Sequence, residues 1–188
     1  MQSHQFDTTW VSRSGKVIVT DPCYVKKYAV EESSFKIAGL LENVAIGRWN
    51  ASVDRGNFSG WGQRNWILRT WLSDTKCPED GWIDQQFIVG VDSGQAGFFD
   101  LNAYPNDDPG EYGDLDSFYG KCCQATCDAQ YHADVIDYNG NMGVVSSSGI
   151  GDGMYRCSTH TNENGEIDGI MLTFLWEDDS NDSDENSE

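Results

Sequence analysis

The sequence predicts a mainly β protein of the α+β kind, in which an antiparallel sheet, curled or folded into a sandwich, carries one packed helix. Aromatic residues suit strands and glycine suits sharp corners, and the 188-residue chain contains 7 Trp, 8 Tyr, 8 Phe and 20 Gly. Apolar and polar residues also alternate along short segments that are bounded by turn residues. A chain of this length favours one domain with a substantial core.

The first half of the chain contains five segments with strand character. They are Lys16 to Thr20, Arg48 to Val53, Trp61 to Trp71, Phe87 to Val91 and Ala96 to Phe99. We predict that the last two pair with each other across the turn at Asp92, Ser93 and Gly94, because short apolar runs on both sides of a glycine-containing turn are typical of a hairpin.

The C-terminal third has the clearest pattern. Gly143 to Ser147 reads as a strand, Gly149 to Gly153 as a glycine-rich turn and Met154 to Ser158 as a second strand. Asn162 to Gly165 is a hairpin signal, since Asn-Gly accepts the positive φ angles of a tight turn. Ile167 to Trp176 then alternates with period two, with Ile170, Leu172, Phe174 and Trp176 on one face. Together these segments predict a three-stranded antiparallel meander.

One helix is predicted from about Leu115 to Ala129. Two aspartates stand at its start, where negative charge is favourable, and apolar residues follow at helical spacing. This stripe consists of Phe118, Cys122, Ala125 and Ala129. A second, weaker helical pattern runs from about Glu31 to Glu42, and Asn102 to Gly113 reads as a loop.

Charge is distributed unevenly along this acidic chain. The net charge is −19 at pH 7, which disfavours nucleic acids and anionic lipids as partners, whereas a basic protein or a cation is electrostatically easier. Residues 177–188 offer almost no apolar side chain for burial, so they predict a disordered acidic tail after a single domain over residues 1–176. Such a tail is consistent with a solubility function or with imitation of a polyanion.

The termini and cysteines indicate a protein of the cytoplasm. Residues 1–10 lack a secretory signal, and no apolar run reaches the length of a membrane span. The six cysteines are therefore expected to be thiols, although an exported chain could form three disulfides. Cys122, Cys123, Cys127 and His132 lack the second ligand pair of a zinc site, and the carboxylate of Asp21 beside Cys23 disfavours a reactive thiolate there.

Three turns next to strand ends form the candidate site. Loops at strand ends often display binding groups, and if these turns converge they gather carboxylates, hydroxyls and an amide. The candidate ligand-binding residues are Asp21, Tyr24, Asp92, Ser93, Gln95, Ser148, Asp152 and Tyr155. Oxygen-rich groups suit Mg²⁺ or Ca²⁺, although no cofactor is predicted. The alternative is that aspartate and glycine simply build the turns.

The same turns carry a resemblance to a known family. The chain resembles the domain of unknown function 4241 family in four segments, in the same order, from about Gly15 to Phe174. They are Asp21-Pro22-Cys23-Tyr24, Gly47-Arg48-Trp49-Asn50-Ala51, Gly90 to Gly97 and, most specifically, Val145 to Tyr155. Members occur in bacteria and bacteriophages, so the resemblance implies a microbial or phage accessory protein in the bacterial cytoplasm. It implies no reaction.

Three functions are consistent with these observations. The first is a module that binds a small ligand or a host protein through the turn cluster. The second is a divalent-metal-dependent hydrolase that uses Asp21, Asp92 and Asp152 to hold the metal and activate water. The third is a minor structural protein of a phage particle. Three histidines and no Gly-x-Ser-x-Gly elbow give little support to a nucleophilic triad, and enzymatic activity and oligomeric state stay open.

Overall fold

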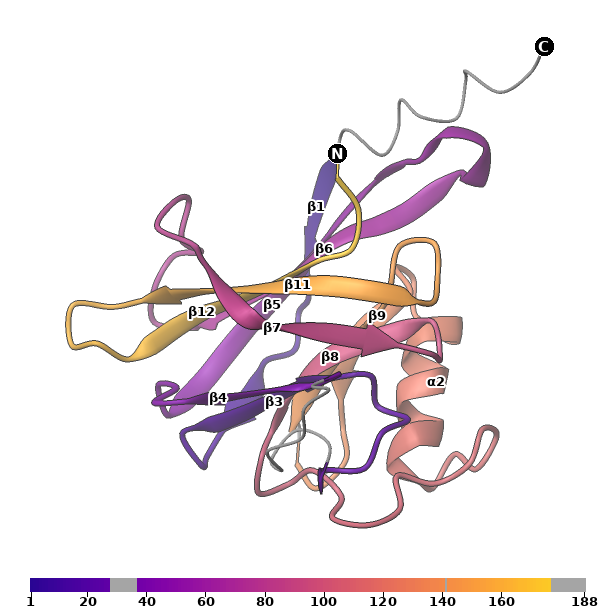
Figure 1. Ribbon diagram of the computed structural model, residues 1–188, viewed down its shortest axis with the longest axis horizontal. Helices are drawn as coiled ribbons and strands as arrows, with labels where there is room; N and C mark the ends of the chain where they lie inside the picture. Colours follow the sequence, from indigo (N-terminus) through magenta and orange to yellow (C-terminus); the bar gives the residue numbers. More distant parts are fainter. Residues whose placement is uncertain (28–36, 141, 177–188) are drawn as a thin grey trace.

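The computed structural model describes residues 1–27, 37–140 and 142–176, and it confirms a mainly β fold. Strands account for 47% of the described residues and helices for 9%, in two antiparallel sheets with a helix packed on them (Figure 1). No helix among these residues is long and apolar enough to span a membrane. The predicted acidic tail, residues 177–188, lies outside the described residues.

The larger sheet has seven strands in the spatial order β1-β5-β6-β12-β11-β7, with β2 paired to a second stretch of β5. Their bounds are Gln2–Gln5 for β1, Trp10–Ser12 for β2, Gly47–Asn57 for β5, Gln63–Leu72 for β6, Ile83–Val91 for β7, Gly153–Thr161 for β11 and Ile167–Thr173 for β12. A 3₁₀ turn, Ser59–Trp61, joins β5 to β6.

The smaller sheet has five strands in the order β4-β3-β8-β10-β9. Their bounds are Lys16–Thr20 for β3, Gly39–Glu42 for β4, Gln95–Asp100 for β8, Ala133–Ile136 for β9 and Gly143–Ser147 for β10. Helix α2, Phe118–Asp128, covers the outer face of this sheet at β9 and β10. The layers are therefore sheet, sheet and helix.

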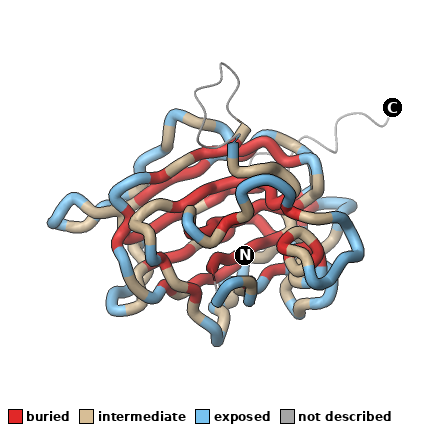
Figure 2. The backbone as a smooth tube through the Cα atoms, turned by 90° about the horizontal axis from the view of Figure 1, so that it is seen from below, coloured by how far each residue is buried: buried red, intermediate tan, exposed pale blue. Residues whose placement is uncertain are grey.

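The main core lies between the two sheets. Trp49, Leu68 and Ile170 project into it from the larger sheet, and Val19 and Phe98 project from the smaller one. These side chains are completely buried, which is why the strands appear as buried bands inside the molecule in Figure 2. Both sheets therefore share one continuous hydrophobic core, which holds them together.

A second core fills the space between the smaller sheet and α2. Ile18, Phe99 and Val145 face the helix, one residue away from neighbours that face the main core. Strands buried on both faces explain the continuous apolar runs of this sheet. Phe118 and Cys122 of the predicted helical stripe pack here. The helix begins at Phe118 because the Ser117 hydroxyl accepts a hydrogen bond from the Gly120 N–H.

Two predicted strand pairings are wrong. β7 and β8 do not form a hairpin, because β7 pairs with β11 whereas β8 pairs with β3 and β10. The C-terminal meander reduces to the β11–β12 hairpin, since β10 belongs to the smaller sheet. Both turns, at 92–94 and 148–152, therefore carry the chain from one sheet to the other.

The remaining differences concern element boundaries. The end of the second predicted helix, residues 39–42, is strand β4, whereas residues 31–36 lie outside the described part of the chain. Trp61 precedes β6 in the 3₁₀ turn. Trp176 follows β12 and is 46% exposed, unlike its predicted face-mates Ile170, Leu172 and Phe174, which are buried.

Candidate functional site

The three predicted turns meet at one corner of the molecule. Val91 pairs with Gly153 in one sheet and Gln95 pairs with Ser147 in the other, so two antiparallel segments bend together between the sheets. The Ser148 N–H donates to the Gly94 carbonyl at 3.0 Å and joins the two bends. Strands that change sheets through a shared bend are typical of corners in sheet packing. The predicted convergence of the turns is therefore present.

Asp21 ties the third turn to this corner. It is completely buried, and Oδ2 accepts from the backbone N–H groups of Asp92 and Ser93 at 2.9 and 2.8 Å. Its Oδ1 accepts from the Ser93 hydroxyl at 2.6 Å and from the Cys23 N–H at 2.9 Å. Four donors occupy the carboxylate, so Asp21 stabilises the corner and leaves little capacity for a ligand.

The turn at residues 148–152 satisfies its own polar groups in a similar way. The Ser148 hydroxyl donates to the Gly151 carbonyl at 2.8 Å, and the buried Tyr155 hydroxyl donates to the same carbonyl at 2.6 Å. Gly94 lies here at φ +70°, where a Cβ would come within 4.0 Å of the Gly151 Cα. A residue with a side chain would be strained at this φ, so glycine serves the bend.

A buried polar chain connects the corner to helix α2. Gln95 donates to the Cys123 Sγ at 3.3 Å and accepts from the Thr126 hydroxyl at 3.2 Å. Tyr119 lies near Ser93 and Cys123, and burial is the main cause that raises the pKa of its phenol to about 12. The pKa of the Cys23 thiol is raised first by burial and then by Asp21, which agrees with the prediction against a nucleophilic cysteine.

The exposed carboxylates of the corner are Asp92 and Asp152. The Asp92 carboxylate accepts from the Tyr24 hydroxyl at 2.6 Å, whereas Asp152 reaches the rim of a small pocket formed with Phe58, Ile150 and Leu175. In the part of the chain that the structure describes, no three His, Cys, Asp or Glu side chains gather so as to hold a metal ion. The hydrogen bonds of Asp21, Ser148 and Tyr155 give the corner the geometry of a structural joint.

A larger hollow than the pocket at the corner lies on the outer face of the seven-stranded sheet. We call it the outer groove; its volume is about 1250 Å³. Its lining residues are Met1, Ser3, Trp66, Ile67, Arg69, Cys77, Pro78, Glu79, Trp82, Asp84, Arg156, Ser158, Met171, Thr173, Leu175 and Trp176. Concave sites that combine apolar and aromatic walls with a few polar groups are the usual places for ligands.

Strand register places the floor of the outer groove in two rows. One row runs from Arg156 on β11 through Thr173 on β12 to Ile67 on β6. The next row runs from Asp84 on β7 through Ser158 and Met171 to Arg69. Residues two apart on a strand share a face, so four strands that are distant in the sequence assemble this floor.

Both arginines of the floor have an acidic neighbour. Arg69 Nη1 lies 2.5 Å from Asp54 Oδ2, and this pair is largely buried. Arg156 is more open, with 61% of its side chain exposed, and lies 3.8 Å from Asp84 Oδ2. Its guanidinium is stacked 5.5 Å from the centre of the Trp176 ring. The floor is therefore close to electrically neutral within an acidic protein.

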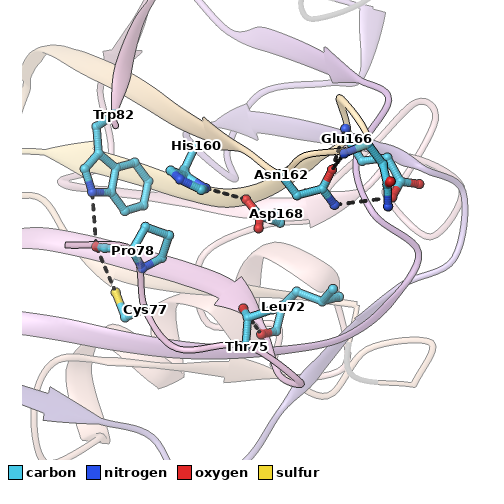
Figure 3. A network of polar contacts seen from close by, with 10 residues as sticks. Leu72, Thr75, Cys77, Pro78, Trp82, His160, Asn162, Glu166 and Asp168 are labelled. Carbon is cyan, nitrogen blue, oxygen red and sulfur yellow. Dashed lines mark hydrogen bonds and ion pairs between the residues drawn. The ribbon is translucent and has the colours of Figure 1, made fainter. Parts of the chain in front are cut away.

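The loop between β6 and β7 builds the other end of the groove. Its Trp82 Nε1 donates to the Pro78 carbonyl at 3.3 Å, and the Trp82 ring meets His160 edge to face (Figure 3). Beneath it, His160 Nδ1 lies 2.6 Å from Asp168 Oδ1. A Cβ on Gly169 would lie 3.0 Å from Trp82, so the missing side chain lets the loop pack closely.

The outer groove is not evident from the sequence. A local signal existed in the alternation of Arg156, Ser158 and His160 along β11 and of Gly169, Met171 and Thr173 along β12. The alternation marks an outward face, but only the long-range register joins these residues to Arg69, and only the loop contacts place Trp82 above them.

The chain shows no detectable similarity to characterised proteins that would assign the site. No family model matches it, and no curated protein or solved structure matches it significantly. The resemblance to the domain of unknown function 4241 family therefore stays a prediction.

Proposed function

We propose that this protein is a binding module that receives a small ligand or a host protein in the outer groove. The observation that carries this proposal is the groove itself. Along β11, Trp176 lies beside Arg156 and Trp82 lies beside His160, and Met171 pairs with Ser158 between these two positions. Aromatic side chains with polar groups between them give both contact area and orientation. On the resemblance above, we also propose a bacterial or phage setting.

The turn cluster supports the same class of function less well. Asp21, Gln95, Ser148 and Tyr155 are buried and hydrogen-bonded within the corner. A ligand would have to compete with contacts that hold the two sheets together. We therefore assign the corner to architecture and the groove to binding, and we do not extend the metal-dependent hydrolase hypothesis.

Unpartnered polar atoms beside the groove agree with this assignment. Trp66 Nε1 and Asp54 Oδ1 are buried and have no hydrogen-bond partner among the described residues. Trp66 lines the groove, and Asp54 pairs with the groove residue Arg69. Buried polar groups usually find a partner, so the wall at Trp66 and Asp54 holds polar groups that a ligand would reach through a local rearrangement.

Comparative capture from a bacterial lysate tests the proposal. Wild type is compared with Trp82→Ala and Trp176→Ala, which alter opposite ends of the groove, and with Trp61→Ala as a control, because Trp61 is 58% exposed outside the groove lining. We expect one protein or small molecule to be retained by wild type and Trp61→Ala. Both groove variants should lose it by roughly tenfold or more, since buried aromatic anchors dominate interfaces.

Two further variants separate the groove from the corner. Asp92→Ala and Asp152→Ala alter only exposed carboxylates, so both should retain the captured molecule. Capture lost in these two variants but kept in Trp82→Ala and Trp176→Ala would move the site to the turn cluster. Capture that all variants retain equally would refute both locations. Unfolding curves confirm that each variant is folded.

A further inference from the structure

We propose that the outer groove binds an extended, basic segment of a partner protein with an apolar side chain as its central anchor. This inference rests on the proposed function, because it names the occupant of the same groove. Three properties of the groove carry it: its length, its nearly neutral apolar floor and the acidic character of its surroundings.

The groove is long enough for an extended chain. Its lining reaches from Asp84 on β7 to Ser3 on β1, and the strands between these edges follow the order β7-β11-β12-β6-β5-β1. Neighbouring strands lie about 4.8 Å apart, so the five intervals span roughly 24 Å, which is the length of about seven extended residues. A compact small molecule would occupy only part of this length.

The floor favours an apolar anchor. Met171 lies between Ser158 and Arg69 in the second row of the floor, and Thr173 and Ile67 lie side by side in the first row. Arg69 and Arg156 are each offset by an aspartate, so the floor presents little net charge. An apolar side chain that covers this floor gains binding free energy from the hydrophobic effect. It does not bury an unpaired charge, because both arginines keep their aspartate partners.

The surroundings of the floor attract positive charge. The β6–β7 loop carries Asp74, Glu79 and Asp80 against the single Lys76. The whole chain carries a net charge of −19 at pH 7. Lysine or arginine on both sides of an anchor would meet these carboxylates and the faces of Trp82 and Trp176. Acidic segments, nucleic acids and anionic lipids would be repelled.

Selection from a randomised phage-displayed peptide library against the full chain tests the occupant. We expect enriched peptides to place Lys or Arg on both sides of an apolar residue. In fluorescence anisotropy, their affinity should fall roughly tenfold or more between low and high salt. Trp82→Ala and Trp176→Ala should abolish the enrichment.

A charge-matched pair of variants sharpens the test. Glu79→Gln with Asp80→Asn removes two carboxylates beside the groove and should weaken a selected basic peptide roughly threefold for each charge. Asp128→Asn with Asp137→Asn removes two exposed carboxylates near α2 and should change its affinity little. Equal effects of the two pairs would overturn local recognition of basic residues.

Separate experiments test the occupant and the groove. Enrichment of neutral or acidic peptides, or of no peptide at all, overturns the basic segment as the occupant. The lysate comparison of Trp82→Ala and Trp176→Ala with Trp61→Ala decides independently whether the groove binds anything, including a saccharide or another small molecule.

Discussion

Asp21 and Ser93 are 72 residues apart in the chain, yet the Ser93 hydroxyl donates a 2.6 Å hydrogen bond to the Asp21 carboxylate. This contact joins the end of β3 to the bend where β7 passes into β8. The same carboxylate holds two backbone N–H groups of the bend. Asp21 and Ser93, which the sequence presents as candidate ligand-binding residues, therefore stabilise the junction between the two sheets.

Replacement of Asp21 by asparagine should destabilise the whole fold. The asparagine amide nitrogen is a donor, so it cannot accept the hydrogen bonds that one Asp21 carboxylate oxygen now accepts. Its N–H groups would face the donors of the bend in a buried site. We expect a loss of about 2–4 kcal/mol in the free energy of unfolding, measured with urea. Asp152→Asn, at an exposed position of the same corner, should change it by about 0.5 kcal/mol or less. Equal effects would contradict the structural role of Asp21.

Replacement of Gly169 by alanine should loosen the β6–β7 loop. The new Cβ would lie 3.0 Å from Trp82, 3.1 Å from His160 and 3.3 Å from Pro78, which would cost about 1–2 kcal/mol or displace the loop. Lys76 lies within this loop, so trypsin should cleave after it faster in the variant. Gly60→Ala is the control, because a Cβ there meets nothing within 4 Å. Unchanged cleavage at Lys76 would argue against the packing described.

The ion pair of Asp54 and Arg69 should matter more than the exposed pair of Lys16 and Glu42. The side chains of the first pair are 10% and 24% exposed, and those of the second are 44% and 64% exposed. Asp54→Ala leaves an arginine half-buried without its partner and should cost about 2 kcal/mol. Glu42→Ala should cost about 0.5 kcal/mol or less because water screens that pair. Chemical unfolding of both variants measures the difference.

Stability should fall under alkaline conditions. Burial raises the pKa of the Cys23, Cys122 and Cys157 thiols above 9.0 and of the Tyr104 phenol above 10.0. In the unfolded chain these groups ionise near their ordinary values, whereas in the folded protein they keep their protons. The unfolded state then binds fewer protons, so the free energy of unfolding decreases as pH rises above about 9. Unfolding curves between about pH 7 and 11 measure this slope, which Cys157→Ser should reduce. A flat profile would contradict neutral buried thiols.

The sequence alone predicts most of the strands, the helix α2 and the main turns, but it misses β1, β2 and β9 and assigns residues 39–42 to a helix. These predictions rest on local patterns. They are the alternation along β5 and β12, the Asn-Gly signal before β12 and the helical spacing of Phe118 and Cys122, and each pattern follows from the geometry of a strand, turn or helix. The convergence of the three turns was a hypothesis from the sequence, and it is the tertiary contacts of Asp21 and Ser148 with the 92–94 bend that bring the turns together.

Strand partners and the role of the turns, in contrast, depend on contacts between distant parts of the chain. A hairpin turn and a bend between two sheets both use aspartate and glycine. Residues 92–94 therefore do not indicate which of the two they form, although β7 in fact pairs with β11 and β8 with β10. The outer groove depends on the register of four strands and on a loop that packs against Gly169. Such pairings are fixed by the burial of both sheets in one shared core, a property of the whole chain that no short segment carries.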